Sequence, residues 1–206
     1  MTQTRTLPLQ RGKHDKERRQ QSLVEAATAV FAEHGYDAAT TREVAERACC
    51  AEGLIHRYFG GKRGLLLAVC ESKAAEAMEA FKAGSPCDCV EEEVEQLLLL
   101  TLATFWEHPD FMRVSVSQAI VDPEVSHTVR DRIVQQRILR MVDKLRPHKD
   151  ASRIRDDVDL ESVARIIVGL GFAMGFFGQV VFGMDRDYLR RVAAAAARVL
   201  SRGIAP

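Results

Sequence analysis

Apolar residues recur at helical spacing through most of this chain. Near its start, Leu23, Ala27, Val30 and Phe31 fall at i, i+4, i+7 and i+8, which places them on one face of a helix that stops at Gly35. No stretch of the sequence alternates with period two over the length of a strand, and no repeat of solenoid length is present. We therefore expect an all-α fold.

Two short helices are expected next, with a tight turn between them. Thr40 and Glu43 have the spacing of a capping box, so the first short helix begins directly after Thr40. The second presents an apolar face at helical spacing and ends at two glycines; these residues are Ile55, Tyr58, Phe59, Gly60 and Gly61. Two short helices joined by a tight turn have the layout of a helix-turn-helix, here at residues 40–59.

Long helices are expected in the remainder of the chain. One runs from Lys62 to about Lys82, before Gly84, Ser85 and Pro86, and would link two domains. The later helices are expected at Val90–Glu107, Pro109–Val121, Pro123–Leu145, Leu160–Met184 and Arg186–Arg202. We thus expect a basic flexible arm at 1–16, a three-helix helix-turn-helix domain at 17–63 and a larger helical domain at 64–206.

The chain has no net charge, but basic residues gather near its start. Lys plus Arg equals Asp plus Glu, at 29 each, yet residues 5–19 hold six basic residues and only two acidic ones. A basic arm can follow a phosphate backbone, and a solvated tail is the alternative interpretation. Residues 1–21 lack an apolar core of the kind that signal peptides contain, so we expect a cytoplasmic protein.

The cysteines do not indicate a metal or cofactor site. There are five of them, an odd number without zinc-finger spacing, so we expect reduced structural thiols and no bound metal or cofactor. A redox sensor or metal site built on Cys87 and Cys89 is the alternative. It would need further ligands of the type that metals require.

One segment is apolar enough to suggest a membrane. Ile166–Met184 contains no charged residue and is barely long enough to span a bilayer. It also contains five glycines and Gln179. A helix that is apolar all round in a soluble protein is buried on every side, in the core and against a partner chain, and Gly171 and Gly175 would permit close helix approach in either setting. We expect a buried dimer helix and no membrane partner.

The helix-turn-helix region resembles the TetR family of bacterial regulators. The resemblance covers roughly Arg18 to Val69 and rests on Gly35-Tyr36, Thr40-Thr41-Arg42-Glu43-Val44-Ala45, Gly53, Ile55, Tyr58-Phe59 and Lys62. It implies a DNA-binding transcriptional regulator, a repressor released from its operator by a small-molecule ligand. It also implies a homodimer on a palindromic double-stranded operator, with ligand binding and dimerisation in the domain at 64–206.

The residues themselves also support DNA contact. With Ile55 and Phe59 turned inward, the exposed side of the third helix would enter a major groove, where Arg57 can offer a bidentate fork to guanine. By resemblance Arg42 is the other base reader, and either arginine could instead bind phosphate. The full set of DNA-binding candidates is Thr40, Thr41, Arg42, Glu52, Gly53, His56, Arg57, Tyr58 and Lys62. The alternative interpretations are a simple helix cap for Thr40, a core residue for Tyr58 and a surface charge for Lys62.

The chain departs from the family pattern at four positions. Cys49 stands where a turn glycine is usual, Ala51 where a capping serine or threonine is usual, Leu54 where a threonine is common and His56 where a phosphate-binding tyrosine is common. A lost cap costs about 1 kcal/mol, so we expect the fold to survive and the recognition helix to start less firmly.

Bulky apolar residues gather in the C-terminal part of a chain that is only 6% aromatic. They could line a cavity for an apolar or aromatic ligand, and ordinary helix-bundle core is the alternative. The ligand-binding candidates are Phe105, Trp106, Phe111, Met112, Gln118, Met141, Phe172 and Phe176. The sequence holds no P-loop, no G-x-S-x-G, no H-E-x-x-H and no paired-cysteine motif, so we do not expect an enzyme.

Overall fold

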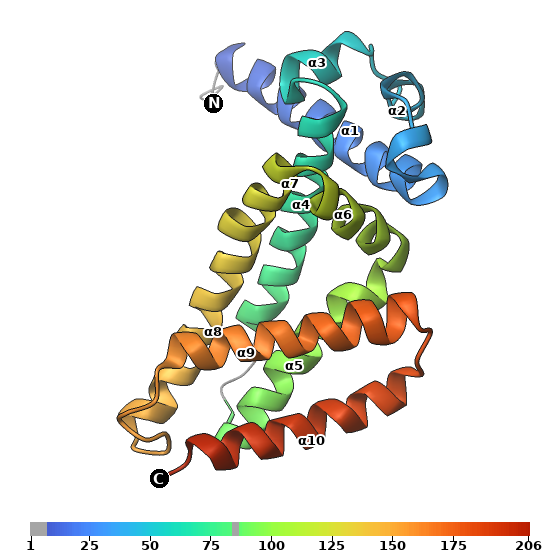
Figure 1. Ribbon diagram of the computed structural model, residues 1–206. Coiled ribbons are helices and arrows are strands. Elements are labelled where there is room, and N and C mark those ends of the chain that lie inside the picture. Colours follow the sequence, from blue (N-terminus) through green and yellow to red (C-terminus); the bar gives the residue numbers. More distant parts are fainter. Residues whose placement is uncertain (1–7, 84–86) are drawn as a thin grey trace, which may run out of the picture. The chain divides into compact units, whose positions relative to one another are not determined.

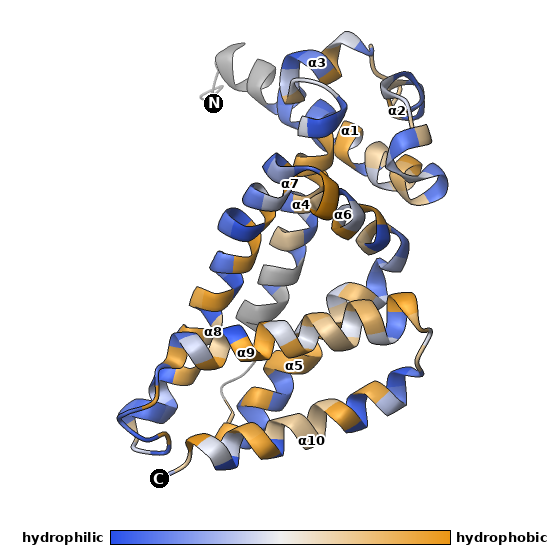
Figure 2. Ribbon diagram, viewed as in Figure 1, coloured by the Kyte–Doolittle hydropathy of each residue, from blue (hydrophilic) through white to orange (hydrophobic). Residues whose placement is uncertain are grey.

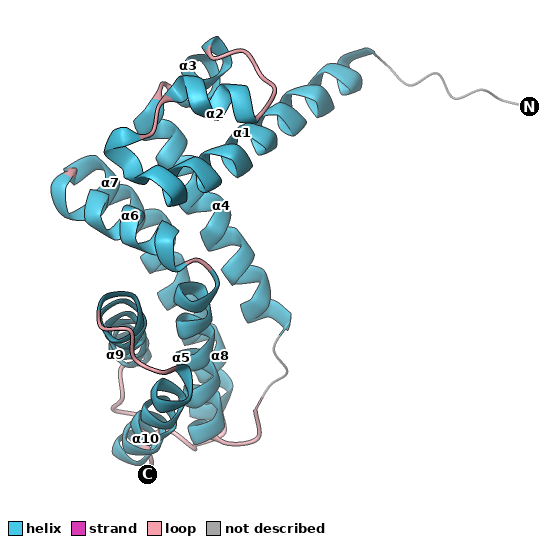
Figure 3. Cartoon of the chain, turned by 90° about the vertical axis from the view of Figure 1, so that its right-hand side faces the viewer, coloured by secondary structure: helices cyan, strands magenta, loops and turns pink. Residues whose placement is uncertain are grey.

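A computed structural model of the protein describes residues 8–83 and 87–206 (Figure 1). Every regular element in these two ranges is a helix, as predicted (Figure 3). The chain divides into two compact units, Met1–Ser72 and Lys73–Pro206. The division falls inside the linking helix, nine residues beyond the boundary expected from the sequence, because that helix belongs to both units.

The first unit contains the expected helix-turn-helix. Its elements are α1 (Pro8–Ala38), α2 (Thr41–Arg47), α3 (Gly53–Phe59) and the first part of α4 (Lys62–Ala83). Residues 8–16, assigned from the sequence to a flexible arm, form the first turns of α1, and residues 1–7 lie outside the described range. The predicted stop at Gly35 is present as a break in α1, where φ is 75°.

The core of the first unit follows the apolar pattern. Leu23, Ala27 and Phe31 of α1 are fully or almost fully buried, as are Val44 of α2 and Ile55 of α3. Three helices of which two are short can share one core only if each contributes an apolar face. Burial of that shared face gives the helix-turn-helix its stability.

The second unit is a larger helical bundle. Beyond α4 it contains α5 (Val90–Glu107), α6 (Pro109–Val121), α7 (Pro123–Thr128), η1 (Val129–Val134), α8 (Gln135–Asp150), α9 (Leu160–Phe172), η2 (Ala173–Val181) and α10 (Arg186–Ile204). The starts of these helices agree with the prediction because local signals set them: the side chains of Asp122, Asp159 and Asp185 accept backbone N–H groups in the first turn.

Three of the expected helices differ in detail; the last of them, expected at Arg186–Arg202, continues to Ile204. The helix from Pro123 continues to Asp150 rather than ending at Leu145, and the helix from Leu160 ends at Val181 rather than Met184. Each of these two also contains a π-helical segment, η1 or η2, in which the backbone hydrogen bonds span five residues. Periodicity alone does not distinguish such a segment from an α-helix.

Helix α5 lies at the centre of the second unit. It packs against α8, α9, η2 and α10, and its residues Val94, Leu98 and Leu102 are completely buried. In Figure 2 the hydrophobic residues run along α5, α9 and α10. A helix with apolar residues on most of its surface needs neighbours on several sides, and the bundle supplies them.

Two glycines allow α9 and η2 to approach α5 closely. A Cβ atom on Gly171 would overlap the Thr101 side chain, and one on Gly175 would overlap the Phe105 ring. The stretch Leu160–Val181 is long and apolar enough to cross a membrane by length and composition. Here its glycine-bearing side packs on α5, whereas Ile166, Phe177 and Val181 are exposed in the single chain, so the expected burial against a partner chain stays a prediction.

We expect Gly175→Ala to destabilise the second unit. The added methyl group would push against the buried Phe105 ring, so the free energy of unfolding should fall by about 1–3 kcal/mol. Gly203→Ala is the matched control, because a Cβ there meets nothing within 4 Å. Urea unfolding followed by fluorescence of the single tryptophan, Trp106 on α5, would report on this unit. Equal stabilities for the two variants would contradict the close approach.

Candidate nucleic-acid interface

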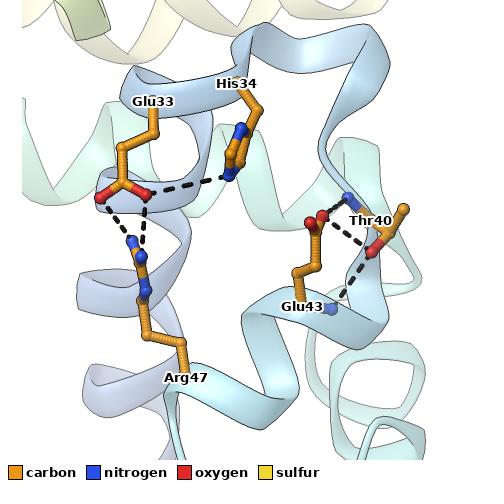
Figure 4. A network of polar contacts seen from close by, with 5 residues as sticks. All are labelled: Glu33, His34, Thr40, Glu43 and Arg47. Carbon is orange, nitrogen blue, oxygen red and sulfur yellow. Dashed lines mark hydrogen bonds and ion pairs between the residues drawn. The ribbon is translucent and has the colours of Figure 1, made fainter.

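The predicted capping box at the start of α2 is confirmed. The Thr40 amide donates to Glu43 Oε2 at 2.9 Å, and the Glu43 amide donates to Thr40 Oγ1 at 3.1 Å (Figure 4). The Thr40 hydroxyl also donates to Glu43 Oε2, at 3.0 Å, and the two bonds that this carboxylate accepts, from the Thr40 amide and hydroxyl, hold the pKa of Glu43 below its usual value. Thr40 is therefore the N-cap of α2, and it is exposed at the surface.

An ion pair that sequence reasoning missed fixes the other end of α2. Arg47 donates to both carboxylate oxygens of Glu33 on α1, at 2.7 and 2.8 Å, and His34 lies 3.9 Å from the same carboxylate (Figure 4). The pKa of Glu33 is lowered, chiefly by the hydrogen bonds from Arg47. No local spacing indicates a pair whose members lie 14 residues apart.

The turn between α2 and α3 contains two of the residues that depart from the family pattern, Cys49 and Ala51. Cys49 has a φ of 51°, the left-handed conformation that glycine adopts most easily. Glu52, directly before α3, makes no side-chain hydrogen bond to the free amides of that helix. Helix α3 therefore starts without a side-chain cap, as expected from the alanine at position 51. Instead, Glu52 Oε1 accepts a hydrogen bond from Thr41 Oγ1 at 2.5 Å.

The exposed side of α3 is the one expected from the sequence. Ile55 is completely buried, whereas Glu52, Gly53, His56 and Arg57 are exposed. Within the part of the chain that the structure describes, the Arg57 guanidinium has no hydrogen bond or ion pair. A planar cation with five donors therefore projects freely from this helix.

The other arginine proposed as a base reader is already engaged. Arg42 is exposed on α2, and its Nε donates to Glu46 Oε1 at 2.9 Å. The pKa of Arg42 is raised, first by this hydrogen bond and further by the charges of Glu46 and Glu52. An exposed pair of this kind is weak in water, so Arg42 can exchange Glu46 for another acceptor.

Tyr58 and Lys62 are only partly exposed and contact their own unit. The Tyr58 ring meets the Phe59 ring edge-on at 6.3 Å, and Lys16 Nζ lies 5.7 Å from its centre. Lys62 Nζ donates to the Asp37 carbonyl oxygen at 3.1 Å and lies 4.5 Å from the centre of the Tyr36 ring. Tyr58 thus contacts α1 from α3, and Lys62 contacts α1 from the first residue of α4.

The ligand-binding candidates in the second unit are only partly brought together. Phe105, Phe172 and Phe176 form one aromatic cluster, with ring centres 5.8 Å apart for the first pair and 5.4 Å apart for the second. Phe111 and Met141 are buried in the bundle on α6 and α8. The remaining candidates, all partly buried, are Trp106, Met112 and Gln118.

Two polar atoms near these residues are buried without a hydrogen-bond partner among the described residues. They are Trp106 Nε1, a donor, and Gln179 Oε1, an acceptor. The Trp106 ring also lies beside two cations, with the guanidinium carbons of Arg190 and Arg186 at 4.9 and 5.7 Å from its centre. Buried polar atoms in native proteins are usually satisfied, so these two mark places where a bound molecule could supply the missing bonds.

The thiols show no clear reactive or metal-binding centre. Burial raises the pKa of Cys70 to about 12, and burial together with Glu93 raises that of Cys87 to about 11. Cys49 and Cys89 are exposed. Across residues 8–83 and 87–206, the structure groups no three His, Cys, Asp or Glu side chains as a metal site would require.

Comparison with known proteins points to one family. Residues 23–69 match the family described as bacterial regulatory proteins, tetR family. The HTH-type transcriptional repressor AcnR of Corynebacterium glutamicum is 30% identical over 181 residues, which cover 84% of this chain and 87% of that repressor.

Solved structures show the same fold. The GusR structure from Salmonella enterica has a TM-score of 0.73 at 16% identity and covers 89% of this chain and 95% of its own. A FadR structure from Bacillus subtilis in complex with stearoyl-CoA has a TM-score of 0.69 at 16% identity. The match covers 89% of this chain and 98% of the FadR chain.

Proposed function

Because the chain belongs to the tetR family of bacterial regulatory proteins and is a DNA-binding transcriptional regulator, we propose that it is a cytoplasmic repressor released from its operator by a small ligand. Its relative AcnR is named as a transcriptional repressor, which supports repression as the sign of its action. The single observation that carries the proposal is the exposed face of α3, with Arg57 free, behind a capped α2.

Helix α3 is proposed to enter the major groove. In helix-turn-helix proteins the N-terminal residues of the second helix contact base edges while the first helix crosses the backbone. Here Glu52 and Gly53 stand at that N-terminus, and His56 and Arg57 are exposed on the same helix one turn later. Arg57 and Arg42 would read bases, since a guanidinium fork matches the O6 and N7 acceptors of guanine.

The backbone contacts are proposed to come from the rim of the same surface. The Glu43 amide is engaged in the capping box, so the amides of Thr41 and Arg42, the first two of α2, are the ones proposed to meet a phosphate oxygen. Tyr58 and Lys62 would contact the backbone farther along. Contacts of this type fix register and carry no sequence information.

Selection of genomic fragments by the purified chain tests the function directly. We expect enrichment of fragments that share an inverted repeat, since a two-fold dimer binds two half-sites. The shared sequence would then serve as the operator in every binding experiment below. Failure to enrich any common sequence would contradict a sequence-specific repressor.

Arg57→Ala and Lys62→Ala should weaken binding in different ways. Loss of the Arg57 fork should cost roughly 1–3 kcal/mol on the operator and relax the preference at one base position. Loss of the Lys62 charge should weaken binding to all sequences alike. It should also reduce the slope of log affinity against log salt concentration by about one, the value for one phosphate contact. Titrations of operator variants at several salt concentrations distinguish the two, and thermal unfolding checks that Lys62→Ala, which also loses the contact to Asp37, remains folded. A base preference altered by Lys62→Ala alone would refute this placement of α3.

A homodimer through the last two long helices is the second part of the proposal. Large apolar side chains are exposed along this region of the single chain, including Ile166, Phe177, Val181, Phe182 and Met184. A run of exposed apolar residues this long marks an interaction surface, and a two-fold interface would cover it with the same surface of a second copy.

Phe177→Glu should therefore produce a monomer. Phe177 is 48% exposed, so a carboxylate there is tolerated by the single chain but would be buried in the dimer. Ile120→Glu is the control, because Ile120 is 78% exposed on α6, which is not one of the helices proposed to form the interface. The molar mass of each variant in solution is measured by light scattering. If the Phe177→Glu variant remains a dimer, or if the Ile120→Glu variant becomes a monomer, the interface lies elsewhere.

The ligand is proposed to be a small apolar or aromatic molecule bound in the second unit. The FadR structure, which shares the fold, holds stearoyl-CoA. In this chain the aromatic cluster of Phe105, Phe172 and Phe176 would supply the apolar contacts, while Trp106 Nε1 and Gln179 Oε1 would supply a donor and an acceptor. Pockets of this kind combine an apolar lining with a few polar groups that fix orientation.

A variant in which all five cysteines are replaced by serine should still respond to the inducing extract or compound. The raised pKa values of Cys70 and Cys87 leave little thiolate at these two positions, which argues against oxidation there. Release of labelled operator from wild type and variant, by the same cell-extract fraction, is the measurement. If the variant folds and binds operator but is no longer released, a thiol rather than a bound ligand controls the protein.

A further inference from the structure

Glu52 places a negative charge on the surface that is proposed to face DNA. It stands directly before α3 and is exposed. A carboxylate at this point can accept the free amides of its own helix, where the helix dipole also favours a negative charge. Here it makes no such bond and accepts from the Thr41 hydroxyl on α2 instead, at 2.5 Å.

The hydrogen bond from Thr41 limits where this carboxylate can point. Thr41 is the first residue of α2 and Glu52 precedes the first residue of α3, so the bond joins the N-terminal ends of the two helices of the motif. These are the ends that approach the backbone and the base edges in a helix-turn-helix complex. Arg42, the other proposed reader on α2, lies close enough for the charge of Glu52 to raise its pKa.

A carboxylate in this position discriminates between sequences by its charge and by its lack of donors. Phosphates repel it on any DNA, and this repulsion opposes binding regardless of sequence. At base edges it can only accept hydrogen bonds. Cytosine and adenine present an amino group in the major groove, at N4 and N6, whereas guanine and thymine present the carbonyl oxygens O6 and O4 at the corresponding place.

We propose that Glu52 is a specificity-determining residue that selects an amino base over a keto base at one position of each half-site and weakens binding to all other DNA. The inference rests on the proposed entry of α3 into the major groove. Glu52 then acts with a sign opposite to that of Arg57: the arginine strengthens binding to the operator, and the glutamate lowers affinity wherever its oxygens meet phosphate or a carbonyl. Thr41 is the positioning residue that holds the carboxylate toward the base edge.

Three variants separate this role from a merely structural one. Glu52→Gln removes the charge but keeps an oxygen that can accept from Thr41. Thr41→Val keeps the charge but removes the hydrogen bond that positions it. Glu107→Gln removes one exposed negative charge from the end of α5 in the other unit, and controls for the change in net charge.

The measurements are affinities for the selected operator, for a panel with each base at each half-site position, and for unrelated DNA of the same length. For Glu52→Gln we expect about fivefold tighter binding to unrelated DNA, the factor that one contact between unit charges gives in water. The preference for adenine or cytosine over guanine or thymine should disappear at one position, because an amide can both donate and accept. Thr41→Val should weaken that preference without the tighter binding to unrelated DNA that Glu52→Gln gives, because the Glu52 charge remains, and Glu107→Gln should change neither.

The outcomes that overturn the inference are distinct from those that overturn the proposed function. If wild type selects an operator but Glu52→Gln keeps the base preference and the affinity for unrelated DNA, Glu52 has no part in specificity and the proposed function stands. The inference also fails if Glu52→Gln lowers thermal stability and weakens every sequence equally, since Glu52 would then only brace α2 against α3. If wild type selects no sequence at all, the proposed function and this inference fail together.

Discussion

The helix-turn-helix depends on one constraint, which is that neither of its helices is long enough to be stable alone. Helices α2 and α3 have seven residues each, well below the length at which an isolated helix persists in water. Their stability therefore comes from a shared core with α1, in which Val44 and Ile55 are buried against the apolar face of that helix. Every polar group of the proposed interface takes its direction from this core.

Directional contacts add precision to that core. The capping box sets the first turn of α2, the Arg47–Glu33 pair ties its last residue to α1, and the Thr41–Glu52 bond joins α2 to the start of α3. Each of these bonds is exposed and individually weak. Together they add directional constraints to two short helices that bury few residues, Val44 and Ala45 in α2 and Ile55 in α3.

A different constraint governs the second unit, which contains the segment Ile166–Met184 without a charged residue. One side of this segment packs on α5, where Gly171 and Gly175 remove the steric barrier to close approach. The opposite side exposes large apolar residues in the single chain. The same segment thus supplies both a core contact and an interaction surface, which explains why its composition satisfies the criteria for a membrane span.

Local chemistry made much of the fold predictable from the sequence. The helices Val90–Glu107 and Pro109–Val121 were predicted with their observed ends, and the capping box at Thr40 and the stop at Gly60 were predicted as well, because caps, prolines and glycines act within a turn of the residues they affect. The exposure of Glu52, His56 and Arg57 followed from the helical period once Ile55 was assigned to the core. The spacing of the motif also sufficed to identify the family.

Contacts between residues distant in sequence were decided only by the tertiary structure. The bonds from Arg47 to Glu33, from Thr41 to Glu52 and from Lys62 to Asp37 join groups 11 to 25 residues apart, and no periodicity encodes which surface charges will meet. The π-helical segments and the extension of α8 to Asp150 likewise escaped prediction. Helical periodicity determines which side of a helix is apolar, whereas the partners of its polar side depend on how the helices are packed in three dimensions.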